Sequence, residues 1–203
     1  MYSRISNLVL GFHGCDRAVG NKILHSRGAL HLEKSSNDYD WLGNGIYFWE
    51  NNPGRALKFA QDAVTNKRLT KGEIKEPVII GAVIDLGHCL NLLDSLFLIE
   101  LKKTYELMKI SGSELPVNEY RDDSGYFLKR NLDCAVIETL HSLKKKKNER
   151  QFDSVRGVFV EGKELYPSAG FREKNHIQLC IRNPNCIKGY FHPQEISPKY
   201  TIP

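Results

Sequence analysis

The sequence predicts a mixed α+β fold in which several short strands pack as two small, mostly antiparallel sheets with helices beside them. Apolar runs of strand length alternate along the chain with stretches of helical periodicity, without an internal repeat or a low-complexity linker. At 203 residues and 41% hydrophobic content, the chain can close one sizeable core. We therefore expect a single domain over residues 1–203, with a helical insertion at about residues 90–150.

The strands are predicted from short apolar runs. The run over residues 78–86 (Val-Ile-Ile-Gly-Ala-Val-Ile-Asp-Leu) is almost continuously apolar, which is typical of a central strand in a sheet. The run over residues 176–182 alternates apolar and polar side chains, as a half-buried strand does. Strands are expected at residues 6–12, 45–49, 78–86, 154–160, 176–182 and 187–191.

Four helices are predicted from apolar periodicity and from end signals. The first, over about residues 19–27, can be capped by Asp16 or Asn21, and Gly28 suits the residue after its C-terminus. The second opens at Pro53, because proline fits a first helical turn. The helices of the insertion are expected over residues 94–109 and within 125–147. Loops are expected at residues 35–40, 65–77, 112–124 and 162–175.

Composition narrows the class of protein. The first nine residues lack the features of a signal peptide, and no apolar run reaches the roughly 18 residues that span a bilayer, so we expect a soluble, cytoplasmic protein without a membrane partner. The five cysteines show no CxxC pair and no zinc-ligand spacing. We expect reduced, mostly buried thiols and no metal.

The net charge of +5 is compatible with a nucleic-acid partner but does not establish one. Its densest part is the run of four lysines at residues 144–147. Such runs are more often solvated helix ends or loops than nucleic-acid contacts.

Two glycine-bearing runs carry the clearest functional signal. Gly11-Phe12-His13-Gly14 is expected to end a strand with a histidine beside a glycine, and Gly43-Asn44-Gly45-Ile46-Tyr47-Phe48 to form a tight turn before a strand with an aromatic ring. Glycine lets a ligand approach the backbone closely, and Gly45 is predicted to do so here. The two runs predict a cleft for a flat, polar, ring-bearing ligand.

Four blocks in one order resemble the NAD-binding half of ADP-ribosyltransferases of the diphtheria-toxin and poly(ADP-ribose) polymerase type. The resemblance covers about a quarter of the chain and implies an ADP-ribosyltransferase-like split β-sandwich, with NAD as a substrate and no metal. The blocks are His13-Gly14, Ile23-Leu24-His25-Ser26-Arg27-Gly28-Ala29-Leu30, Gly43-Asn44-Gly45-Ile46-Tyr47-Phe48 and Pro53-Gly54-Arg55-Ala56-Leu57-Lys58-Phe59-Ala60.

The resemblance also implies roles for single residues. His13 would donate a hydrogen bond to the adenine-side ribose, and the backbone of Gly14 would bind the nicotinamide carboxamide. Tyr47 would stack on the nicotinamide ring, which positions the ligand without acting in the chemistry. The family often has a second stacking tyrosine at the position of Lys58, and the neighbouring Phe59 replaces it if the helix register allows.

One position departs from the family. The family's catalytic glutamate, which binds the nicotinamide ribose 2′-OH, corresponds to Gln178. A glutamine carbonyl still accepts a hydrogen bond but stabilises developing positive charge less. Three interpretations stay open: Gln178 suffices for transfer to a nucleophile that needs no general base, a nearby carboxylate supplies the charge, or the domain binds NAD without turnover. The candidate carboxylates are Glu161, Glu164 and Glu173.

The loop before that strand corresponds to the segment that faces the acceptor in the family. Phe171, Arg172 and Glu173 lie in it, and the first two can stack on or pair with a base or phosphate, although such residues often serve only as a packed latch. Asn37, Asp38 and Asp40 are further candidates for ligand contact, or for a turn role.

These observations predict a mono-ADP-ribosyltransferase that cleaves NAD at the nicotinamide bond and passes ADP-ribose to a macromolecule, with nucleic acid favoured over protein. A role as a toxin with a cognate antitoxin, or in phage defence, extends this hypothesis. An NAD glycohydrolase and an inactive NAD- or ADP-ribose-binding module are the alternatives. Motifs of dehydrogenases, P-loop NTPases, serine hydrolases and zinc proteases do not occur in the sequence.

Overall fold

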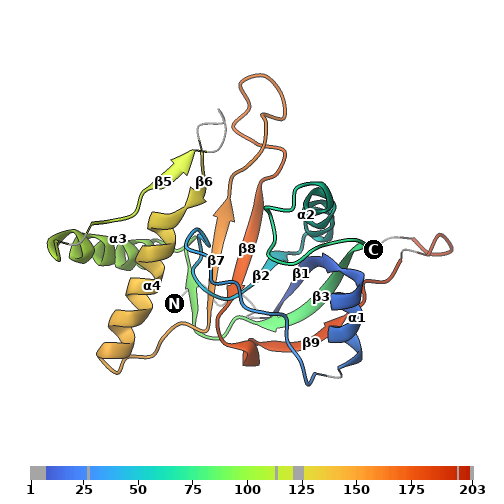
Figure 1. The fold of residues 1–203 in the computed structure, drawn as a ribbon, viewed down its shortest axis with the longest axis horizontal. Coiled ribbons are helices and arrows are strands. Elements are labelled where there is room, and N and C mark those ends of the chain that lie inside the picture. The colour runs from blue at the N-terminus through green and yellow to red at the C-terminus, as the bar shows by residue number, and fades with distance from the viewer. Residues whose placement is uncertain (1–7, 27, 113, 121–125, 196, 202–203) are drawn as a thin grey trace.

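The computed structural model describes residues 8–26, 28–112, 114–120, 126–195 and 197–201, and it confirms the mixed α+β fold (Figure 1). The described strands are β1 (Leu8–Asp16), β2 (Ile46–Glu50), β3 (Pro77–Asp85), β4 (Cys89–Asn91), β5 (Asn118–Tyr120), β6 (Phe127–Arg130), β7 (Ser154–Phe159), β8 (His176–Ile181) and β9 (Ile187–Phe191). The helices are α1 (Arg17–His25), α2 (Pro53–Thr65), α3 (Ser95–Ile110), α4 (Asn131–Lys146) and the 3-10 helix η1 (Pro184–Cys186).

The strands do not divide into two small sheets as predicted. Seven of them form one hydrogen-bonded sheet in the order β4-β7-β8-β2-β1-β3-β9, and β5 and β6 form a separate pair. All neighbours in the large sheet are antiparallel except β4 and β7. The prediction fails because β1 and β2 remain paired over a short length, which is enough to join the two halves.

The junction between β1 and β2 is nevertheless narrow. Pairing there covers Gly11 with Glu50 and Phe12 with Trp49, whereas β1 and β3 pair along the whole of β1, from Leu8 to Asp16. Beyond Phe12 the two strands diverge. The sheet therefore opens between β1 and β2, at the level of His13.

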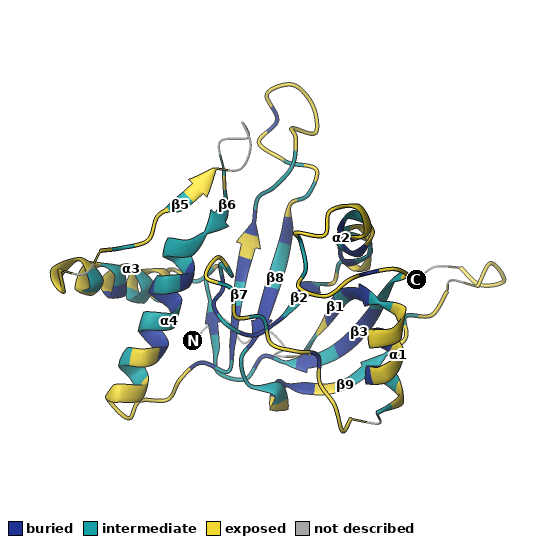
Figure 2. Ribbon diagram, in the orientation of Figure 1, coloured by how far each residue is buried: buried dark blue, intermediate teal, exposed yellow. Residues whose placement is uncertain are grey.

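Helices cover both faces of the large sheet. Ile23 of α1 belongs to the buried cluster on the face that carries Phe48, while Ile137 of α4 packs with Cys180 on the other face. Ala56 of α2 packs near the junction, against Phe12 and Trp49. Figure 2 shows buried stretches along β7, β8 and β3 and on the inner side of α4.

Most element ends follow local signals. The Asp16 side chain accepts from the N–H of Ala18 and caps α1, and Asn52 caps α2 ahead of Pro53. Gly28 adopts a left-handed backbone with φ of 86°, as expected near a helix end.

Other boundaries differ from the prediction. The first strand runs through His13 to Asp16, because β3 pairs with it over that whole length. The expected loop at residues 112–124 contains β5, which pairs with β6; residues 113 and 121–125 lie outside the described residues. The short strand β4 was not predicted, and it forms through parallel pairing with β7.

All five cysteines are free thiols, and all except Cys89 are buried, which confirms that they are mostly buried. Within the described ranges, no helix combines the length and apolar character needed to cross a membrane. No group of histidine, cysteine and carboxylate side chains among these residues could hold a metal ion.

Candidate functional site

His13 spans the opening between β1 and β2. Its Nδ1 lies 2.8 Å from the carbonyl oxygen of Tyr47, and its ring packs edge-on against Phe48. Burial lowers the pKa of His13, although the bond to the Tyr47 carbonyl raises it, so the ring is neutral near pH 7. Because a carbonyl only accepts, Nδ1 carries the proton and Nε2 is left as an acceptor. A ribose hydroxyl would then donate to His13, the reverse of the predicted direction.

The backbone of Gly14 faces the same opening. The carbonyl of Leu10 accepts a 2.9 Å bond from the N–H of Asn51, so the peptide groups of Leu10 face β2. Alternate residues of a strand direct their peptide groups to the same side, so those of Gly14 point to where β2 has diverged. A β-carbon at Gly14 would lie 2.1 Å from the carbonyl oxygen of Ala56, so α2 can approach β1 only because this residue is glycine.

Tyr47 is held by the glycine turn that precedes it. Its hydroxyl donates to the carbonyl of Gly43 at 2.9 Å and accepts from the N–H of Leu42 at 3.0 Å. Burial raises the pKa of Tyr47 well above its usual value, so the phenol stays protonated. A β-carbon at Gly45 would lie 2.5 Å from Cys180 Sγ, so glycine is required there for packing on β8, whether or not a ligand approaches it.

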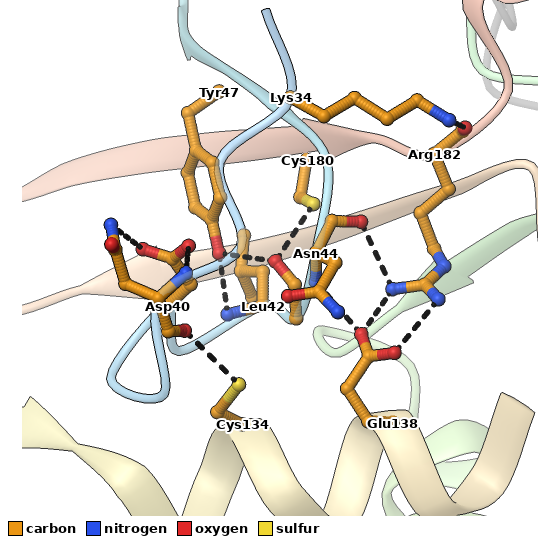
Figure 3. A network of polar contacts seen from close by, with 11 residues as sticks. Lys34, Asp40, Leu42, Asn44, Tyr47, Cys134, Glu138, Cys180 and Arg182 are labelled. Atoms are coloured by element: carbon orange, nitrogen blue, oxygen red, sulfur yellow. Dashed lines mark hydrogen bonds and ion pairs between the residues drawn. The ribbon is translucent and has the colours of Figure 1, made fainter. Parts of the chain in front are cut away.

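A polar network ties this turn to α4 and to the end of β8 (Figure 3). Both guanidinium nitrogens at the tip of Arg182 contact the carboxylate of Glu138, and one also donates to the carbonyl of Asn44. The N–H of Asn44 donates to Glu138 at 2.7 Å. Burial raises the pKa of Glu138, but Arg182 and Asn44 outweigh it and lower the pKa overall. The network fixes the turn from which Tyr47 emerges, and sequence analysis did not identify it.

Gln178 lies on β8 directly across from Trp49, and therefore on the sheet face that also carries Tyr47. Trp41 Nε1 lies 2.6 Å from Gln178 Oε1. Because an indole N–H only donates, this contact assigns the amide orientation and leaves the Gln178 amide nitrogen as a donor. The oxygen predicted to accept the ribose hydroxyl already accepts from Trp41.

Trp41 is itself held in place over the sheet. It packs against Phe159 with 5.1 Å between ring centroids, and the Arg130 guanidinium lies 4.8 Å from its ring. A β-carbon at Gly157 would lie 2.9 Å from the Trp41 ring, so glycine makes room for the indole beside Gln178.

Two of the candidate carboxylates, those of Glu161 and Glu164, are engaged away from Gln178. β7 places Gly157 opposite Gln178, and Glu161 follows four residues later, about 13 Å along an extended chain. Glu161 pairs with Arg55 at 2.9 Å. Glu164 accepts from the N–H of Ser168 at 3.0 Å and lies 3.5 Å from Arg172. The backbone N–H of Glu173 donates to the carbonyl of Lys163 within the same loop.

The loop at residues 160–175, hereafter the hairpin loop, connects β7 to β8 and projects from the sheet (Figure 1). The Phe171 residue is 63% exposed, so it is available to a partner. Arg172 pairs with Glu164 and lies over the Tyr126 ring at 5.2 Å. Phe59, the predicted second stacking ring, packs on Trp49 with 5.0 Å between centroids.

Two surface depressions of the described chain lie elsewhere. A surface depression of about 260 Å³ is lined by residues that include His31, Pro184 and Tyr190. Another, of about 210 Å³, is lined by Leu8, Val9, Leu10, Asn51 and Val83. Neither depression includes His13, Tyr47 or Gln178.

The chain resembles the uncharacterized protein MJ0359 of Methanocaldococcus jannaschii. The two are 30% identical over 201 residues, which covers 87% of this chain and 83% of MJ0359. The two chains belong to one family. No family model matches the chain, and no solved structure matches it significantly. Any functional proposal therefore depends on the geometry of the site and on the sequence motifs.

Proposed function

We propose that the protein is a cytoplasmic mono-ADP-ribosyltransferase that binds NAD where β1 and β2 diverge. The observation that carries this proposal is that the three family positions lie on neighbouring strands. His13, Tyr47 and Gln178 are far apart in sequence, yet they lie on β1, β2 and β8, which are consecutive strands of the sheet. In this interpretation, the narrow β1–β2 junction corresponds to the split of the ADP-ribosyltransferase-like β-sandwich.

The backbone at the opening suits the proposed ligand. The N–H and C=O of Gly14 together match the donor and acceptor of a carboxamide. In the reaction, the bond between the nicotinamide nitrogen and ribose C1′ breaks and its electron pair stays with nicotinamide. An acceptor nucleophile bonds to C1′, and the proton that the acceptor loses goes to solvent. The positive charge of the pyridinium ring is thereby neutralised on departure.

Gln178 limits what this site can do. It supplies no negative charge to an oxocarbenium-like state, so transfer is slow and favours an acceptor that needs no general base, such as a nucleobase nitrogen. Successive additions, which activate a ribose hydroxyl each time, are not expected. The product is a single ADP-ribose on the acceptor.

The exposed Phe171 supports contact between the hairpin loop and a nucleic-acid base. The lysine run adds little, because Figure 1 shows the C-terminal end of α4 far from that loop. Lys144 also pairs with Glu100 at 2.8 Å. A toxin with an antitoxin partner, or a phage-defence protein, fits this activity; unimpaired growth on expression would contradict the toxin role.

The test is nicotinamide release from NAD, with the protein alone and with RNA, DNA or cell protein. We expect release that rises with nucleic acid and falls in His13→Ala, Tyr47→Ala and Gln178→Ala. Arg17→Gln, at an exposed ion pair on α1, is the matched control. Release that is independent of acceptor would identify a glycohydrolase, and stimulation by protein alone would identify a protein-directed transferase.

A binding module is the second candidate, and one observation favours it. The Trp41 N–H already donates to the Gln178 oxygen that the family mechanism uses, which leaves that oxygen one acceptor site for a ribose hydroxyl. This candidate predicts measurable NAD or ADP-ribose binding without nicotinamide release under any of these conditions.

A further inference from the structure

Buried donors without partners gather beneath the base of the hairpin loop. Within the described chain, Trp49 Nε1, Arg55 Nε and Arg55 Nη1 have no hydrogen-bond partner. Trp49 is 4% exposed, and the Arg55 side chain is 10% exposed. Buried polar groups are nearly always hydrogen-bonded, because leaving one unpaired destabilises the fold. Three such donors on two adjacent side chains indicate that an acceptor group belongs here.

These groups form one cluster. The Arg55 guanidinium carbon lies 5.8 Å from the Trp49 ring centroid. The centroids of the Trp49 and His176 rings are 6.1 Å apart. His176, which is 6% exposed, also has an unpartnered ring nitrogen, Nε2. Its Nδ1 lies 2.6 Å from the carbonyl of Lys174, so Nδ1 carries the proton and Nε2 is an acceptor.

The charges specify the class of ligand. Arg55 and Lys174 are positive, and Glu161 is the carboxylate that pairs with both, at 2.9 and 3.7 Å. The cluster thus keeps one excess positive charge and three unused donors. A phosphate group carries negative charge and enough oxygens to accept all three. A hydroxyl on that phosphate, or on the sugar beside it, can donate to His176.

We infer that Trp49, Arg55 and His176 form a phosphate-binding site. In the unbound protein, the carboxylate of Glu161 in the hairpin loop pairs with Arg55 and competes with phosphate for this site. Glu161 reaches only one nitrogen of Arg55, which explains why the other donors are unused. Phosphate entry requires Glu161 to leave. Gly162, the next residue in the hairpin loop, has a left-handed backbone with φ of 91°.

The inference stands on these orphan donors and does not depend on ADP-ribosyl transfer. The phosphate can belong to a small nucleotide or to the backbone of a nucleic acid. Titration calorimetry with the full chain therefore uses three probes: inorganic pyrophosphate, ADP-ribose and a single-stranded oligonucleotide. No NAD is present in these titrations, so none of the probes reacts, and failure of catalysis would not affect the result.

Pyrophosphate should bind the wild-type protein. Arg55→Gln and Trp49→Phe should each weaken binding about tenfold, the effect of losing a charge-assisted or buried hydrogen bond. Trp49→Phe keeps an aromatic ring for packing and removes the N–H, so it tests the site even if Arg55→Gln folds poorly. Glu161→Gln should strengthen binding about tenfold. Arg17→Gln is the control and should change nothing.

The probes identify the source of the phosphate. If ADP-ribose binds at least as tightly as pyrophosphate does, the result supports a nucleotide site. Preferential binding of the oligonucleotide supports a nucleic-acid site. The inference is overturned if no probe binds, or if the Trp49, Arg55 and Glu161 variants bind as Arg17→Gln does.

Discussion

The imidazole Nδ1 of His13 lies 2.8 Å from the carbonyl oxygen of Tyr47, so a side chain of β1 bonds the backbone of β2 where the two strands separate. The His13 side chain gives the Tyr47 carbonyl a hydrogen-bond partner. Without it, this carbonyl would lose its partner in the sheet, because β1 and β2 separate there. The side chain also fixes the distance between the strands at the mouth of the opening. Structure and proposed ligand binding therefore depend on the same residue.

His13→Ala should lower the free energy of unfolding by about 1–3 kcal/mol, because a partly buried carbonyl loses its donor. Urea unfolding measures this change, and NAD binding should weaken in parallel. His25→Ala is a matched control, since His25 Nδ1 also contacts a carbonyl, that of Asn21 at 2.7 Å, but on the exposed surface of α1. Equal destabilisation by the two substitutions would show that the position of His13 has no special role.

Gln178→Glu should raise nicotinamide release at least about tenfold, because a carboxylate on β8 would stabilise positive charge developing on the ribose. Trp41 Nε1, 2.6 Å from the present amide oxygen, would hold that carboxylate in the same orientation. Steady-state nicotinamide release measures the effect, and Gln178→Ala controls for loss of the amide. A Gln178→Glu protein that folds and binds NAD but releases no more nicotinamide would contradict the proposed transferase.

Local sequence signals were sufficient for much of the fold. Asp16 and Pro53 mark helix starts because capping depends on residues within one turn. β4 and β5 were missed because three residues are too few to show an alternating pattern, and their pairing is set by distant segments. The joining of the sheet depends on only two residue pairs between β1 and β2, which no local pattern specifies.

The candidate site could be predicted only in part, because some of its contacts also join distant segments of the chain. Motif residues such as His13 and Tyr47 stand beside glycines that mark them in the sequence. Trp41 contacts Gln178 only because β2 and β8 are neighbours, and no spacing along the chain encodes that contact. The Glu138–Arg182 pair likewise depends on how α4 packs on β8.

Glu138→Gln should destabilise the protein by about 2 kcal/mol, a value between those for exposed and buried ion pairs, because both side chains are partly buried. The change leaves Arg182 without a counter-charge beside the glycine turn. Thermal unfolding measures the loss. Glu106→Gln, at an exposed ion pair with Lys109 on α3, is the control. If the two variants were equally stable, the network would not fix the turn.

The protein should lose stability as the pH falls from about 6.5 to about 4. Burial, with a smaller contribution from Arg182, lowers the pKa of His141 from 6.5 to about 4, and burial does the same for His176. Between these values the unfolded chain binds protons that the folded chain does not, so stability rises with pH. Each histidine then contributes on the order of 3 kcal/mol at neutral pH that is lost on acidification.

His141→Leu should remove about half of the pH dependence that these two histidines cause. His141 is 3% exposed, and both of its ring nitrogens lack partners within the described chain, so the substitution removes no hydrogen bond from that part of the structure. Urea unfolding at pH 7 and pH 4.5 should show a difference in stability that is smaller than in the wild type by about 2–3 kcal/mol. His25→Leu, on the exposed surface of α1, should leave the wild-type difference unchanged. An unchanged pH dependence in His141→Leu would mean that the folded protein binds a proton at this buried site as readily as the unfolded chain does.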